Sequence, residues 1–154
     1  MVFSEVSANV LDAFRQSRAA DLSMADLIEA AAAFGADPSG PRLDLEATER
    51  LGWPVFDREL RALAEGAYAV MQAVAERLAE HLRALCGDAP PDEVMCLGGG
   101  AQSAFWRQLK QRATGARMRR LPIDEPTCRG AAVCAVAGLT DRSVRDIATQ
   151  WSDA

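Results

Sequence analysis

The chain has 154 residues, of which 49% are hydrophobic and 25% charged, and its net charge is −5. This length and composition predict one soluble globular domain, residues 1–154, with a core of its own. The negative charge excludes a general attraction to nucleic acid or anionic membranes. No stretch approaches the roughly 20 apolar residues that span a bilayer, and no signal-peptide pattern opens the chain, so we expect a cytoplasmic protein without a membrane partner.

The cysteines and the histidine give no sign of a metal centre. None of the cysteines has CxxC spacing or a histidine nearby to complete a site. We therefore expect reduced, buried thiols at Cys86, Cys96, Cys128 and Cys134. The one histidine, His81, lies in a predicted helix rich in charged residues, which favours a solvated position over a catalytic one.

The first quarter of the chain is predicted to be helical. Apolar residues recur at helical intervals between residues 4 and 17, and Ser23 with Asp26 indicates the start of a second helix that runs to about Phe34.

A cluster of turn-forming residues follows at 35–41, and no periodicity is sustained through Trp53-Pro54. We expect a long surface connection there. Its larger apolar side chains should be partly packed: Leu43, Leu45, Leu51 and Trp53.

A long helix is predicted from about Asp57 to Leu85, because apolar residues repeat every three or four positions. Gly66 costs about 1 kcal/mol relative to alanine inside a helix, so we expect close backbone packing at this position. Glu65 is interpreted as a solvated helix residue rather than a ligand.

The second half alternates strands and helices. A strand at 93–97 leads into a turn of three glycines, residues 98–100. A helix from about Ala101 to Thr114 follows and ends at Gly115 in the position of a C-terminal cap. A short strand is expected at 117–121. Two more helices follow, one opened by Pro126 after Asp124 or Glu125 and stopping at Gly138, the other near Arg142 to Trp151. This order predicts α/β packing around a small parallel sheet.

The junction Gly98-Gly99-Gly100 between strand and helix is the candidate site. Glycines permit positive φ and close approach of a flat ligand, and the helix that follows presents free N–H groups. Neither the Gly-Lys-Ser/Thr of a Walker A loop nor the G-x-G-x-x-G of a dinucleotide fold is present. Taken alone, such a cluster is more often a tight turn.

The flanking residues favour a nucleotide site, because residues 56–139 resemble the C-terminal domain of the FGGY carbohydrate kinases. The resemblance is carried by several short matches: Glu65-Gly66, the strand up to Leu97, the glycine turn, Gln108, Ala113-Thr114-Gly115 and the run from Glu125 to Ala132. It implies a helix-rich α/β fold, part of a ribonuclease-H-like, actin-like ATPase domain with a small parallel sheet.

The resemblance also implies the site residues. In the family the glycine turn and the next helix hold the adenosine part of ATP or ADP. This role is carried to Gly98, Gly99, Gly100 and Ala101, with Gln102 and Ser103 as weaker additions. The family's catalytic aspartate, sugar-binding residues and main phosphate loops precede this segment. We therefore assign no catalytic residue and no metal ligand, and we expect Mg²⁺ and the sugar only in a complete kinase.

Two further features have simpler interpretations. Gly130-Ala131-Ala132 is expected to let one helix pack tightly near the nucleotide cleft. A basic strip without acidic residues is expected to be a solvated face paired with carboxylates elsewhere, rather than a nucleic-acid interface. Its members are Arg107, Lys110, Arg112, Arg117, Arg119 and Arg120.

Two functions follow. The first is the adenosine-binding part of an ATP-dependent sugar kinase, truncated on its N-terminal side and inactive until joined to the missing half. The alternative is a non-catalytic helical module that self-associates, since about two strands cannot cover the expected apolar helix surface.

Overall fold

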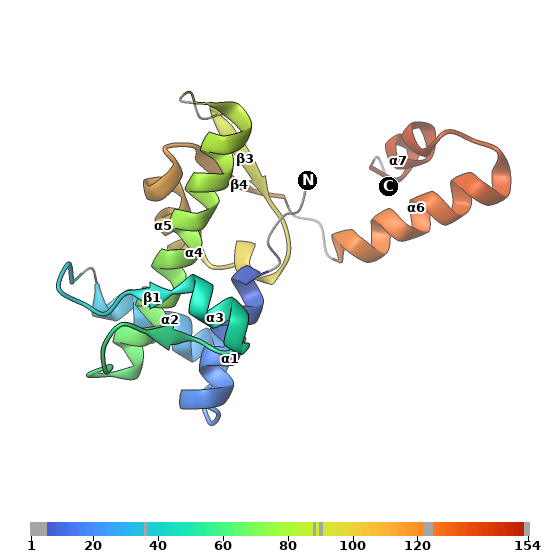
Figure 1. Ribbon diagram of the computed structural model, residues 1–154. Helices are drawn as coiled ribbons and strands as arrows, with labels where there is room; N and C mark the ends of the chain where they lie inside the picture. Colours follow the sequence, from blue (N-terminus) through green and yellow to red (C-terminus); the bar gives the residue numbers. More distant parts are fainter. Residues whose placement is uncertain (1–5, 36, 88, 90, 122–124, 153–154) are drawn as a thin grey trace. The chain divides into compact units, whose positions relative to one another are not determined.

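The computed structural model describes residues 6–35, 37–87, 89, 91–121 and 125–152 (Figure 1). The chain forms two compact units, Met1–Arg120 and Leu121–Ala154. The fold is helix-rich α/β, as predicted, whereas the single domain over 1–154 and the ribonuclease-H-like details stay predictions. No helix among the described residues is long and apolar enough to cross a bilayer.

The first unit is built around one long helix, α4, which contacts three other helices (Figure 1). These four helices are α1 (Val6–Arg18), α2 (Met24–Phe34), α4 (Leu63–Cys86) and α5 (Ala104–Thr114). The core between them is closed to solvent at Phe14, Leu27, Met71 and Leu109. Burying one such side chain contributes about 1.5–3 kcal/mol, so this interface is the main source of stability in the unit.

The predicted start of α2 is confirmed in detail. The Ser23 hydroxyl accepts a hydrogen bond from the Asp26 N–H at 3.2 Å, and the Asp26 carboxylate accepts one from the Ser23 N–H at 3.3 Å. This reciprocal pair satisfies two N–H groups that the first turn leaves free.

The predicted unstructured connection is wrong in part. It contains strand β1 (Leu43–Asp44), helix α3 (Leu45–Leu51) and strand β2 (Val55–Phe56), with β1 and β2 antiparallel. Asp44 caps α3, and Gly52 ends it in the left-handed region. Two-residue strands and a seven-residue helix are too short to produce a periodic pattern, so periodicity could not predict them.

The partial packing expected for the apolar side chains of this connection is confirmed for two of the four. Leu43 is buried and Leu45 half-buried, but Leu51 and Trp53 are 51% and 46% exposed. The two exposed side chains lie where α3 ends and its connection to β2 begins, beyond the part that packs against the core.

Helix α4 begins at Leu63, six residues after the predicted start. The Arg61 N–H donates to the Glu65 carboxylate at 2.6 Å instead of joining the helix, so the chain before Ala62 is a loop. The predicted close packing at Gly66 is confirmed: a Cβ there would lie 2.5 Å from Leu60 Cδ1 and 2.6 Å from Phe14 Cζ.

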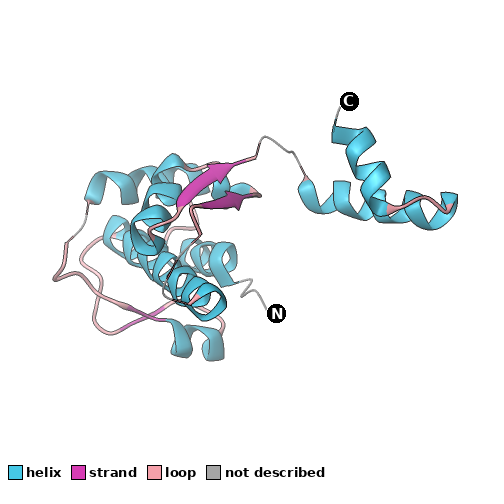
Figure 2. Cartoon of the chain, turned by 90° about the horizontal axis from the view of Figure 1, so that it is seen from above, coloured by secondary structure: helices cyan, strands magenta, loops and turns pink. Residues whose placement is uncertain are grey.

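The predicted parallel sheet is present. Strand β3 (Glu93–Cys96) pairs in parallel with β4 (Arg117–Arg120), and helix α5 connects them (Figure 2). Gly115 ends α5 with φ 74°, and its N–H donates to the Gln111 carbonyl, as expected for a C-terminal glycine cap. The glycine turn therefore lies between a parallel strand and its crossover helix.

The second unit consists of α6 (Pro126–Thr140) and α7 (Val144–Ser152), which contact each other and bury Val133 and Ile147. Pro126 opens α6 as predicted and Glu125 precedes it, while Asp124 lies outside the described residues. The predicted stop at Gly138 is wrong, because the helix continues for two residues and ends where Asp141 takes a left-handed conformation.

Gly130, Ala131 and Ala132 are exposed within the second unit, where a Cβ at Gly130 would meet no described atom within 4 Å. Their packing near the nucleotide cleft stays a prediction. The prediction of buried thiols is wrong. The cysteines are free but not buried, with Cys96 half-buried and Cys86, Cys128 and Cys134 exposed. His81, predicted to be solvated, is half-buried on α4.

Candidate functional site

The glycine turn reverses the chain by a conformation that only glycine adopts readily. Gly98 has φ 79° and ψ −177°, a region that side chains disfavour. The next residues form a single 3₁₀ turn, η1 (Gly99–Ala101), in which the Gln102 N–H donates to the Gly99 carbonyl at 3.0 Å. The positive φ therefore favours glycine at position 98, where the chain leaves β3.

The turn is open on one side and backed on the other. A Cβ at Gly98 or Gly99 would meet no described atom within 4 Å, so the main chain is accessible there. At Gly100 a Cβ would lie 3.4 Å from Trp106 Cζ3, in contact with an indole that is 3% exposed. The arrangement is a one-sided seat, in which a flat ligand can contact the backbone of Gly98 and Gly99.

The three remaining predicted residues differ in what they can offer. Ala101 is 4% exposed, its N–H donates to the Gly98 carbonyl at 3.0 Å and its carbonyl accepts from Arg107, so it supports the turn from inside. Gln102 is exposed. The Ser103 hydroxyl accepts from the Trp106 N–H at 3.1 Å as the N-terminal cap of α5, which leaves its own proton free to donate.

We expect Ser103→Ala to destabilise the first unit by about 1 kcal/mol, because one N–H of the first turn of α5 loses its acceptor. Urea unfolding followed by far-UV circular dichroism measures this. Ser103→Thr keeps the cap and serves as the control. An alanine variant as stable as the threonine variant would show that the cap is not needed.

Arg107 secures the turn from the helix side, a role that the sequence did not reveal. Its guanidinium donates to the Ala101 carbonyl and, at 3.1 Å, to the Gln102 carbonyl. Both acceptors belong to the turn and lie five and six residues before the arginine. The contact depends on the 3₁₀ conformation of the turn, which the spacing of residues in the sequence does not predict.

The basic strip is paired in part, which confirms that part of the prediction. Glu93 on β3 accepts hydrogen bonds from Arg119 Nε at 2.6 Å and from Arg117. These bonds hold the pKa of the Glu93 carboxyl below its usual range, and the bond from Arg119 has the largest effect. Lys110 differs from them: its ammonium lies 4.7 Å from the Trp106 ring centroid, and burial lowers the pKa of its amine.

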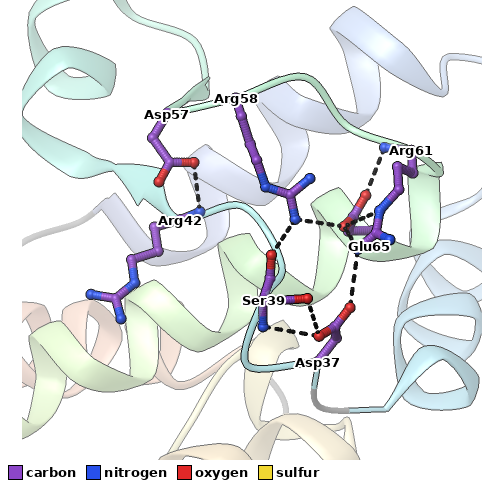
Figure 3. Close-up of polar contacts among 7 residues, drawn as sticks. All are labelled: Asp37, Ser39, Arg42, Asp57, Arg58, Arg61 and Glu65. Atoms are coloured by element: carbon purple, nitrogen blue, oxygen red, sulfur yellow. Dashed lines mark hydrogen bonds and ion pairs between the residues drawn. The ribbon is translucent and has the colours of Figure 1, made fainter.

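Glu65 is the largest correction to the sequence analysis. It was expected to be solvated, yet it is 1% exposed. Its carboxylate pairs with Arg58 at 3.3 Å and Arg61 at 3.2 Å, and Arg61 reaches on to Asp37 at 3.0 Å (Figure 3). The Arg61 N–H, with the two guanidinium groups, lowers the pKa of Glu65.

The same cluster fixes the turn at residues 37–40. Ser39 donates its hydroxyl and its N–H to Asp37 at 2.7 and 2.9 Å, and Arg58 donates to the Ser39 carbonyl (Figure 3). Every carboxylate in the cluster is paired with a donor. The arrangement therefore joins α4 to the preceding loops.

Metal binding finds no support in the part of the chain that the structure describes. There, no three histidine, cysteine, aspartate or glutamate side chains come together as a metal site requires.

Comparison with known proteins identifies the family. Residues 35–139 match the C-terminal domain of the FGGY family of carbohydrate kinases, and the match covers more than half of the chain. The chain belongs to the FGGY family of carbohydrate kinases and contains its C-terminal domain. The match includes the glycine turn, Glu65 and most of α6. A search of curated proteins found no match.

Proposed function

We propose that the glycine turn binds the adenosine part of ATP or ADP, with the main chain of Gly98, Gly99, Gly100 and Ala101 as the seat and Gln102 and Ser103 as side-chain contacts. The chain would supply the adenosine-binding part of an ATP-dependent sugar kinase of the actin-like ATPase fold. The observation that carries the proposal is the open backbone at Gly98 and Gly99, in a family whose members use ATP to phosphorylate sugars.

The proposed role ends at nucleotide binding. Phosphoryl transfer needs a base for the sugar hydroxyl and groups with Mg²⁺ that hold the phosphate in line. We assign none of these to this chain, and the sugar enters only in a complete enzyme. An N-terminal kinase half, or a second copy of the chain, is the proposed protein partner. A cytoplasmic location stays a prediction.

Gly99→Leu tests the proposal by covering the seat. Gly99 is not in the left-handed region and its Cβ position is open, so the variant should fold normally. We expect isothermal titration of the unaltered chain to show ADP and ATP binding up to millimolar concentration, and Gly99→Leu to weaken it at least tenfold, about 1.4 kcal/mol.

Gly138→Leu is the matched control, because it makes the same change at an open glycine of α6. It should leave nucleotide binding unchanged. Absence of binding by the unaltered chain at millimolar nucleotide, or unchanged binding by Gly99→Leu, would remove the proposal.

The alternative, a self-associating module without a ligand, is favoured by one specific observation. Met95 and Leu97, on and just after β3, are 57% and 47% exposed. Adjacent apolar side chains of this size favour burial in an interface. Light scattering after size exclusion, with and without Mg-ATP, distinguishes the two, because a module without a ligand assembles independently of nucleotide.

A further inference from the structure

Lys110, on the second turn of α5, lies at the closed side of the glycine turn. Its ammonium is 4.0 Å from the point where a Cβ of Gly100 would stand, and 4.7 Å from the Trp106 ring centroid. The same indole contacts that Cβ position through Cζ3 at 3.4 Å. Gly100, Trp106 and Lys110 thus form one corner, next to the open backbone of Gly98 and Gly99.

The charge of Lys110 is not paired with a carboxylate of the described residues, and only the Cys96 thiol favours it. No carboxylate of the described residues lies within 4.0 Å of its ammonium, whereas Arg117 and Arg119 both pair with Glu93. Lys110 is half-buried. A partly desolvated ammonium without a counter-ion is costly, and an anion that reaches it gains more than at an exposed lysine.

We propose that Lys110 contacts the phosphate chain of the nucleotide seated on the glycine turn, which makes it a further binding residue of this site. The inference rests on the proposed function, since the nucleotide brings the phosphates to this corner. An ammonium on a flexible stem accepts phosphate oxygens as a point charge. The indole beneath it fixes the stem, so that little side-chain freedom remains to be lost on binding.

A purely structural role is the competing explanation. In that case Lys110 covers Trp106 by a cation–π contact and contributes to stability alone. The two roles differ in one measurable respect. A phosphate contact affects ADP and leaves adenosine unaffected, whereas loss of packing at Trp106 affects the whole seat and therefore both ligands.

The experiment measures the affinity of the full chain for adenosine and for ADP by isothermal titration. The test variant is Lys110→Met, which keeps an apolar stem over Trp106 but removes the charge. We expect it to weaken ADP binding about tenfold to a hundredfold, as for a lost hydrogen bond to a charged group, and to change adenosine binding less than twofold. Lys110→Arg should retain most of the preference for ADP.

Arg112→Gln is the matched control, because it removes an exposed positive charge from the same helix. It should change neither affinity by more than twofold at physiological salt. Equal losses for ADP and adenosine in Lys110→Met, or no loss for either, would overturn the role of Lys110 while leaving the nucleotide seat in place. Failure of the unaltered chain to bind both ligands would remove the seat itself and the role of Lys110 with it.

Discussion

We expect Glu65→Ala to lower the melting temperature of the first unit by about 10 °C or more. The substitution leaves Arg58 without its buried partner and removes one of the two carboxylates that pair with Arg61. It also removes the acceptor of the Arg61 N–H at the start of α4. Arg58 and Arg61 are 38% and 64% exposed, so water can compensate their charges. The loss of stability therefore comes mainly from the cavity left by a side chain that is 1% exposed and from the Arg61 N–H without its acceptor.

The control for this prediction is Glu80→Ala on the same helix. Glu80 is 60% exposed and pairs with Arg77 at 3.5 Å, a surface contact of small value. Thermal unfolding followed by circular dichroism should show a clear loss for the Glu65 variant and almost none for the Glu80 variant. Similar melting temperatures for the two variants would show that the cluster in Figure 3 does not hold α4 to its neighbours.

The pH dependence of Glu65→Gln follows from the same contacts. The pKa of Glu65 is lowered in the folded chain, first by the Arg61 N–H, so its ionised form stabilises the fold above the unfolded pKa near 4.5. That contribution is lost as the pH falls through the folded value. The stability difference between the unaltered chain and Glu65→Gln should therefore be largest near neutral pH and shrink in acid.

The parts of the fold that the sequence predicted correctly carry strong local signals. The capping pair of Ser23 and Asp26, the long apolar period of α4 and the glycine cap at Gly115 each act within a few residues. The parallel pairing of β3 and β4 was also correct, because a strand, a crossover helix and a second strand leave one favoured arrangement.

The contacts that the sequence did not predict depend on distant or irregular chain segments. Glu65 is buried because loops at residues 37–40 and 58–61 approach it, and neither loop has a periodic pattern. The cysteines show the reverse error, since their residue type was taken as a sign of burial, whereas Cys86 is exposed and Cys96 half-buried. Residue type alone did not predict these environments.

The sequence predicted where the candidate site lies but not how its side chains contact one another. The three glycines and Ser103 were identified from composition and order, and Ser103 indeed caps α5. Arg107 and Lys110 were assigned only to a basic strip. Their separate roles depend on where the turn places Ala101 and Trp106, which is a property of the folded chain.

Gly66→Val is expected to destabilise the first unit by about 3 kcal/mol. Its Cβ alone would lie 2.6 Å from Phe14 Cζ and 2.5 Å from Leu60 Cδ1, and valine adds two further methyl groups. Phe14 is fully buried and cannot move aside without displacing the core between α1 and α4. Overpacking therefore exceeds the modest gain in helix propensity over glycine.

Gly130→Val is the matched control, because the same change at an open position of α6 meets no described atom within 4 Å. We expect its effect to stay within about 0.5 kcal/mol. Urea unfolding followed by tryptophan fluorescence measures both variants, with Trp53 and Trp106 in the first unit and Trp151 in the second. Equal stability of the Gly66 and Gly130 variants would mean that α1 and α4 are not in close contact at Gly66. The position of Glu65, one residue before Gly66, depends on that contact.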